Sequence, residues 1–197
     1  MLFNRDKIIL DLCGGTGAWS KPYKDARYDV RVITLPENNV IDYIPPKNVY
    51  GILAAPPCVE FSRALNYHIV VHGRKRDFIK GMIPVNACAR IILISNPVFW
   101  ALENPLGCLS RYLGPWQYIF DPWEFGDPYT KKTCLWGKFY FPKKIYSNRE
   151  AVMSSEQIVL CQENRKPQDC AGSAEQKAIA RAITPPKFAQ AFFEANP

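Results

Sequence analysis

The chain has 197 residues, of which 48% are hydrophobic and 22% are charged. This length and apolar content support one sizeable core and exclude disorder over most of the chain. The seven cysteines are odd in number and contain no C-x-x-C pair, which argues against a disulfide framework or a zinc knuckle and favours reduced thiols. The net charge of +7 favours a polyanionic partner, with nucleic acid as the first candidate.

The apolar stretches are too short to predict a membrane span. The longest, "IILIS" and "VFWAL", are separated by Asn96 and Pro97 well before the roughly 20 residues that cross a bilayer. The start of the chain, "MLFNRDKIILD", lacks the pattern of a signal peptide. We therefore expect a protein of the cytoplasm.

Three apolar runs in the first third of the chain predict strands. Residues 7–11, "KIILD", lead directly into the turn "CGGTG", and two further runs occupy residues 28–35 and 49–55. None of them alternates in polarity, which is typical of central strands in a parallel sheet covered on both faces. Between the first two runs, Ser20 with Pro22 predicts the start of a helix, with Ser20 as its N-cap.

The middle of the chain continues the alternation of predicted strands and helices. The segment after Cys58 shows no clear period, but the apolar spacing of residues 78–95 predicts a buried helix, despite Gly81 and Pro84. Residues 98–105 predict a further strand that proline ends. The alternation of strands and helices predicts an α/β fold, with a Rossmann-like, doubly wound and mostly parallel sheet.

The amino-acid composition changes from about residue 121, where aromatic residues, lysines and prolines predict short strands and loops. At the end of the chain, "ITPPKFAQAFFEA" predicts an amphipathic helix that docks on the core. We expect Thr184 to cap this helix and Pro185 to lie in its first turn. Phe188 and Phe192 are one turn apart and would face the core.

The turn after the first strand is rich in glycine. Gly14, Gly15 and Gly17 would let a ligand approach the backbone closely, although a tight turn from strand to helix needs glycine even where nothing binds. A nicotinamide-binding turn would normally read G-x-G-x-x-G, and Ser20 stands where the third glycine belongs. This difference argues against a dehydrogenase.

A thiol and a carboxyl group end two of the predicted strands. "PPC" places Cys58 after one apolar run, and "LENP" places Glu103 at the end of another. The carboxyl edge of a parallel sheet is where such folds bind ligands, so both side chains could face one pocket and support covalent catalysis. The two prolines would hold the nucleophile in place. The alternative is that Cys58 is a small buried residue at the end of a strand.

Taken in order, "DLCGGTGAWS", "AAPPCVEFS" and "ALENPLG" resemble the signature of cytosine-5 DNA methyltransferases, and the chain is most similar to compact bacteriophage forms. The resemblance covers roughly residues 7–137. It implies a cofactor-binding catalytic core over 1–137, a small, irregular target-recognition segment over 138–173, and C-terminal helices over 174–197 that pack on the core. The implied activity is methyl transfer from S-adenosylmethionine to carbon 5 of cytosine in DNA.

The resemblance also implies catalytic roles. Cys58 matches the nucleophile that adds to carbon 6 of the cytosine, and Glu103 matches the acid that hydrogen-bonds ring nitrogen 3 and the exocyclic amine. Lys131 and Lys132 stand where the family usually has an arginine motif that contacts the base. Because a free thiol has a pKa of about 8.5, we expect a helix start or a cation that stabilises the thiolate.

The same resemblance implies two sets of binding residues. The residues expected at the S-adenosylmethionine site are Asp11, Leu12, Cys13, Gly14, Gly15, Thr16, Gly17, Trp19, Asp42 and Pro56. The residues expected to contact duplex DNA with its target cytosine flipped out are Ser62, Arg63, Arg74, Lys75, Arg76, Lys138, Lys143 and Lys144. The alternatives are a plain core position for Trp19 and a solvated lysine face over a β-ribbon for 138–144.

Departures from the family pattern leave other functions open. Cys13 replaces the usual aromatic residue, and Arg181 and Ala182 replace an expected glycine–asparagine pair. An RNA cytosine methyltransferase and an inactive protein that binds DNA or cofactor are therefore the alternatives. His68 and His72 are four residues apart, but no further ligand lies near them, so we expect no metal. The short recognition segment predicts a short target sequence or a partner protein.

Overall fold

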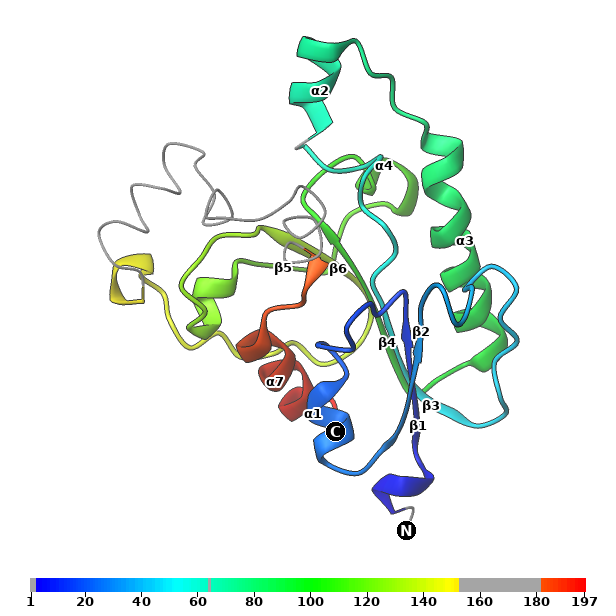
Figure 1. Ribbon diagram of the computed structural model, residues 1–197. Helices are drawn as coiled ribbons and strands as arrows, with labels where there is room; N and C mark the ends of the chain where they lie inside the picture. Colours follow the sequence, from blue (N-terminus) through cyan, green and yellow to red (C-terminus); the bar gives the residue numbers. More distant parts are fainter. Residues whose placement is uncertain (1–2, 64, 153–181) are drawn as a thin grey trace.

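The computed structural model describes residues 3–63, 65–152 and 182–197 (Figure 1). Its centre is a six-stranded sheet with the strand order β2-β1-β3-β4-β6-β5. Helix α3 (Phe78–Ser95) covers one face of the sheet, and α1 (Lys21–Asp25) and α7 (Pro186–Ala195) cover the other (Figure 1). The predicted α/β, doubly wound and mostly parallel sheet is confirmed.

Four neighbouring strands are parallel and two are antiparallel. The parallel strands are β1 (Ile8–Leu12), β2 (Asp29–Ile33), β3 (Val49–Ala54) and β4 (Phe99–Pro105). Strand β6 (Thr133–Lys138) runs antiparallel between β4 and the short edge strand β5 (Tyr118–Phe120). Because the parallel strands point the same way, the loops that follow β1, β3 and β4 meet at one edge of the sheet.

Short helical segments connect these elements. They are η1 (Asn4–Asp6), α2 (Leu65–His72), α4 (Ser110–Leu113), η2 (Pro122–Phe125) and η3 (Arg149–Ala151). The sequence does not predict α2, because its apolar residues do not gather on one side: Leu65 is buried, whereas Val70 and Val71 are exposed. Figure 1 shows α2 beyond the carboxyl ends of the parallel strands.

The core has one layer on each face of the sheet. Leu10 and Leu12 of β1 pack on the side that α3 covers, whereas Ile9 packs on the opposite side with Tyr23 of α1 and Phe188 of α7. Each central strand is therefore apolar on both faces, which explains why its sequence does not alternate in polarity.

Helix α3 has the bounds that the sequence predicts. Asp77 caps it by accepting a hydrogen bond from the backbone N–H of Lys80 (2.9 Å), and Asn96 ends it in the left-handed region (φ 41°). Contrary to the sequence expectation, α3 is long and apolar enough to span a membrane by length and composition alone. Its inner face, which includes Val85 and Cys88, packs on the sheet as that of a core helix does.

One predicted cap is wrong, and the other is confirmed in position. Helix α7 begins at Pro186 with Pro185 as its N-cap, so Thr184 is not the cap. The reason is steric, because a residue that precedes proline disfavours the helical region, and Pro185 is accordingly extended (ψ 127°). Ser20 does occupy the N-cap position of α1, but its hydroxyl makes no capping hydrogen bond.

The predicted division of the chain stays a prediction. Residues 138–152 of the expected recognition segment are described and contain the end of β6 and η3, whereas 153–173 lie outside the described residues. Of the expected C-terminal segment, only 182–197 are described. In that part, α7 packs on the core as expected through Phe188 and Phe192, which are fully buried.

Candidate active site

A tight turn after β3 positions Cys58. Its carbonyl accepts hydrogen bonds from the backbone N–H groups of Phe61 (3.0 Å) and Ser62 (2.8 Å). The Phe61 carbonyl accepts from the N–H of Cys108 (2.8 Å), and Ser62 forms a β-bridge with Gly107. The turn that carries the thiol is thus fastened to the loop that follows β4.

Asn104 joins the ends of β3 and β4. Its side-chain amide donates a hydrogen bond to the buried carbonyl of Pro56 (3.0 Å), and Asn104 itself is fully buried. The bond links Pro56, two residues before Cys58, to Asn104, which directly follows Glu103 in β4. Its buried Oδ1 has no partner among the residues that the structure describes.

Three charged or ionisable groups meet here. Burial raises the pKa of the Cys58 thiol most, the Glu103 carboxylate raises it further, and the Lys131 ammonium lowers it. Lys131 Nζ lies 3.7 Å from Glu103 Oε1. The structure therefore brings Cys58, Glu103 and Lys131 together, and Lys131 supplies the nearby cation that the sequence leads us to expect. Its effect does not outweigh burial, so the net shift of the thiol pKa is upward.

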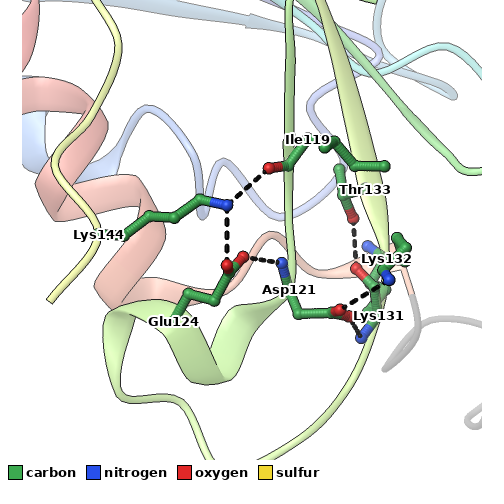
Figure 2. Close-up of polar contacts among 7 residues, drawn as sticks. All are labelled: Ile119, Asp121, Glu124, Lys131, Lys132, Thr133 and Lys144. Carbon is green, nitrogen blue, oxygen red and sulfur yellow. Dashed lines mark hydrogen bonds and ion pairs between the residues drawn. The ribbon is translucent and has the colours of Figure 1, made fainter. Parts of the chain in front are cut away.

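The backbone around Lys131 is held on both sides (Figure 2). Its N–H donates to Asp121 Oδ1 (3.1 Å), and its carbonyl accepts from the Thr133 hydroxyl (2.7 Å). The adjacent Lys132 points to Asp121 instead, with its Nζ 3.8 Å from Oδ2. The two neighbouring lysines thus serve different carboxylates, and of the two only Lys131 pairs with Glu103.

A second carboxylate supports Asp121 (Figure 2). Glu124 accepts a hydrogen bond from the Asp121 N–H (2.6 Å) and pairs with Lys144 Nζ (2.8 Å), which also donates to the Ile119 carbonyl (2.9 Å). Lys144, which we expect to contact DNA, is therefore engaged in an ion pair of the fold. Sequence reasoning missed Asp121 and Glu124, although D-x-x-E ahead of a short helix is the signal of a capping box.

The glycine turn joins β1 to α1 at the same edge of the sheet. Cys13, Gly15 and Gly17 adopt positive φ angles of 57°, 55° and 71°. A Cβ atom at Gly14 would lie 2.4 Å from the Asp11 carboxyl group, so this position requires glycine. A Cβ atom at Gly15 would meet nothing within 4 Å, and Thr16 is exposed, so the outer side of the turn is open.

Asp11 is a fully buried carboxyl group at the base of this turn. Its Oδ2 accepts a hydrogen bond from the Ser20 hydroxyl (2.5 Å), whereas its Oδ1 has no partner among the described residues. Burial raises its pKa to about 6, and the hydrogen bonds from Ser20 oppose this shift. An orphaned carboxylate oxygen beneath an open glycine turn fits the ammonium group of a ligand such as S-adenosylmethionine.

The other residues expected at the cofactor site are dispersed. Trp19 lies in the aromatic core, with its ring 6.0 Å from Phe188 and 5.4 Å from Phe192 between centroids, which is the alternative noted for it. Leu12 is buried under α3. Asp42 is exposed in a loop that Arg90 ties to α3 through the carbonyls on either side of it. The role of Asp42 stays a prediction.

The basic segment after Cys58 contacts the turn that carries the thiol, residues 58–62, which we call the nucleophile turn. Arg74 pairs with Glu60 (2.8 Å), and the Arg76 guanidinium donates to the Glu60 carbonyl (2.6 Å) and the Ser62 carbonyl (3.0 Å). Glu60 was not singled out from the sequence, which contains no signal for this contact. Three further basic residues expected to contact DNA are exposed, namely Lys75, Lys138 and Lys143.

Comparisons with known proteins find similarity only among solved structures. No protein-family model and no curated protein matches the sequence. Among solved structures, the chain is similar to a prophage-encoded E. coli protein described as a candidate DNA modification methyltransferase. The identity is 14% and the TM-score 0.45, over 67% of this chain and 46% of that chain. This chain thus spans about half the length of that protein.

Proposed function

We propose that the protein is an S-adenosylmethionine-dependent DNA methyltransferase that modifies carbon 5 of cytosine through a covalent bond to Cys58. The observation that carries this proposal is the meeting of Cys58, Glu103 and Lys131, which come from three separate segments of the chain. They lie at the edge of the sheet where β1, the neighbour of β3, leads into the glycine turn. The ordered motifs that resemble the cytosine-5 methyltransferases support the same conclusion.

The three side chains have complementary roles in this reaction. Lys131 favours the thiolate of Cys58, which adds to carbon 6 of the flipped base and forms a carbon–sulfur bond. Glu103 hydrogen-bonds nitrogen 3 and the exocyclic amine as the ring gains electron density, so carbon 5 becomes nucleophilic. When bound, S-adenosylmethionine supplies the methyl group as an electrophile. Loss of the carbon 5 proton to solvent then allows elimination of the Cys58 thiolate.

Residues near the glycine turn would hold the cofactor. Asp11 offers a buried carboxylate oxygen, and the open side of Gly15 gives the ligand access to the backbone. The substrate is proposed to be duplex DNA, because the chain carries a net charge of +7 and a basic segment, Arg63 to Arg76, directly follows the nucleophile turn. The exposed side chains of Lys138 and Lys143 would extend this contact.

Covalent trapping tests the proposal. Bisulfite sequencing of DNA from cells that express the protein first identifies the target sequence. Duplexes that carry 5-fluorocytosine at that target should then form a denaturation-resistant adduct, since fluorine does not leave as a proton. Peptide mapping should place the adduct on Cys58, and Cys58→Ser should abolish it.

The alternatives give different results in the same experiment. An adduct with transfer RNA that contains 5-fluorocytosine, but not with duplex DNA, would indicate an RNA methyltransferase. If cofactor binding is measurable by calorimetry while neither nucleic acid forms an adduct, the protein is a binding member of the fold without turnover. Either result overturns the proposed activity.

A further inference from the structure

A second basic feature lies beside the candidate active site. A cavity of about 420 Å³ opens between the start of α2, the start of α3 and the loop after β4. Arg63, Arg76 and Arg111 line it, together with Asn66 and the ring of Phe78. Among the residues that the structure describes, no carboxylate lines this cavity, so three positive charges converge on it without a described acidic partner at its surface.

Arg76 forms the fixed wall of the cavity. Its guanidinium donates hydrogen bonds to the carbonyls of Glu60 (2.6 Å) and Ser62 (3.0 Å) and to Asn66 Oδ1 (2.6 Å). All three acceptors are neutral, so the charge of Arg76 is held in place but not neutralised by them. A rigid, uncompensated guanidinium in a concave site favours an anionic ligand.

Arg63 and Arg111 supply the donors that are available to a ligand. Both side chains are exposed, and among residues 3–63, 65–152 and 182–197 neither makes a hydrogen bond or an ion pair. Arginine presents a planar set of N–H donors that matches two oxygens of a phosphate at once. Two free arginines and one fixed arginine around one cavity therefore fit a phosphate group.

The cavity adjoins the candidate active site. Burial raises the pKa of Cys134 to about 11, Glu103 raises it further, and Arg63 lowers it. Arg63 is thus close enough to act on a residue that also lies in the field of Glu103. The cavity wall is also continuous with the nucleophile turn, because Arg76 binds the carbonyls of Glu60 and Ser62.

We propose that this cavity binds a backbone phosphate of duplex DNA next to the target nucleotide, with Arg63 and Arg111 as the ligating side chains. This inference rests on the proposed function, since it takes DNA as the substrate. It adds Arg111, which the sequence motifs do not indicate, to the DNA-binding residues. The phosphate contact would hold the strand at a fixed distance from Cys58 while the base is flipped out.

The test compares two charge-matched double variants. Arg63→Gln with Arg111→Gln removes both free arginines of the cavity. Arg5→Gln with Arg27→Gln removes two exposed arginines from a hollow that also includes Phe3, Asn4 and Ala26, around the start of the chain and the end of α1. Fluorescence anisotropy measures the affinity of each variant for a labelled duplex, and circular dichroism confirms that both are folded.

We expect the cavity variant to bind duplex DNA at least about tenfold more weakly than the control variant at low salt, since hydrogen bonds to a charged partner are lost. The slope of log affinity against log salt should fall by about one, which corresponds to one phosphate contact. Equal losses in the two variants would show only a bulk charge effect and overturn the inference. Absence of duplex binding by the wild type would also overturn it.

Inorganic phosphate serves as the second probe. If phosphate raises the Tm of the wild type but not of the cavity variant, while duplex affinity is the same in both, the site takes a free anion and not DNA. Adduct formation with 5-fluorocytosine reports the proposed function separately. Selective loss of DNA affinity in a protein that never forms an adduct would uphold the cavity assignment and overturn the activity. If the adduct forms but the cavity variant binds duplex DNA as tightly as the control variant, the activity is upheld and the cavity assignment is overturned.

Discussion

Lys131 Nζ lies 3.7 Å from Glu103 Oε1, and both groups act on the thiol of Cys58 with opposite signs. Glu103 favours the neutral thiol, whereas Lys131 favours the thiolate. Both side chains are largely shielded from solvent, so this is not a surface ion pair. The pair places one hydrogen-bond donor and one acceptor next to the nucleophile.

The first prediction concerns the reactivity of Cys58. Glu103→Gln should lower the pKa of the thiol and accelerate its alkylation by iodoacetamide at pH 8, whereas Lys131→Gln should raise the pKa and slow the reaction, each by about threefold or more. Mass spectrometry of the peptide that contains Cys58 measures the rate at this residue alone. Lys132→Gln should have the smaller effect, since Lys132 pairs with Asp121. Changes of the same sign in the Glu103 and Lys131 variants would contradict the assigned geometry.

The second prediction assigns a positioning role to Asp121, which accepts a hydrogen bond from the Lys131 N–H. Asp121→Ala should release the backbone at Lys131 and destabilise the fold by about 1–2 kcal/mol. It should also shift the pH profile of Cys58 alkylation to higher pH, as Lys131→Gln does. Asp121→Asn keeps an acceptor at the same place and should restore most of the wild-type profile. If Asp121→Ala loses stability but leaves the alkylation profile unchanged, the residue is only structural.

The third prediction follows from the buried carboxyl group of Asp11. Its pKa is about 6 in the folded protein, against its usual value of 3.8. Between these values the folded protein keeps a proton that the unfolded chain releases, so stability falls as the pH rises from about 4 to 6. The full difference corresponds to about 3 kcal/mol.

Urea unfolding of the wild type and of Asp11→Asn between pH 4 and pH 7 measures this effect. Because asparagine does not ionise, the variant should lack the loss of stability in this window and should be the more stable protein at pH 7. The Asp11→Asn variant should bind S-adenosylmethionine more weakly than the wild type, since the side chain at position 11 no longer carries a negative charge. Identical pH dependence in the two proteins would show that Asp11 does not titrate in this range.

The fourth prediction tests the link between the two strand ends. Asn104→Ala removes the donor to the buried Pro56 carbonyl and should lower the free energy of unfolding by about 1–3 kcal/mol. Asn86→Ala, at an exposed position on α3, is the matched control and should change it by no more than about 0.5 kcal/mol. Similar losses in the two variants would mean that the Asn104 bond adds nothing to stability.

The strands and the main helix could be predicted from the sequence because their signals are local. Apolar runs without alternation mark strands that are covered on both faces, and Asp77 and Asn96 mark the ends of α3. The meeting of Cys58 and Glu103 could also be predicted, since β3 and β4 are parallel and the ends of parallel strands share one edge of the sheet.

The role of Lys131 could not be separated from that of Lys132 in the sequence. The choice depends on the register in which β6 pairs with β4, where Leu135 lies opposite Glu103, and on the hydrogen bond from Asp121. Both are long-range contacts without a local pattern. Arg111 was missed for the same reason, because only the fold of the loop after β4 brings it to the cavity that Arg63 also lines.

The antiparallel strand β6 lies between β4 and β5, so the interior strand β4 has a free edge until residue 138 has been synthesised. During translation, an apolar strand would therefore leave the ribosome ahead of its pairing partner and remain open to other chains. Chains truncated before β6 should aggregate or recruit chaperones, and co-expression of the missing part as a separate peptide should rescue their solubility.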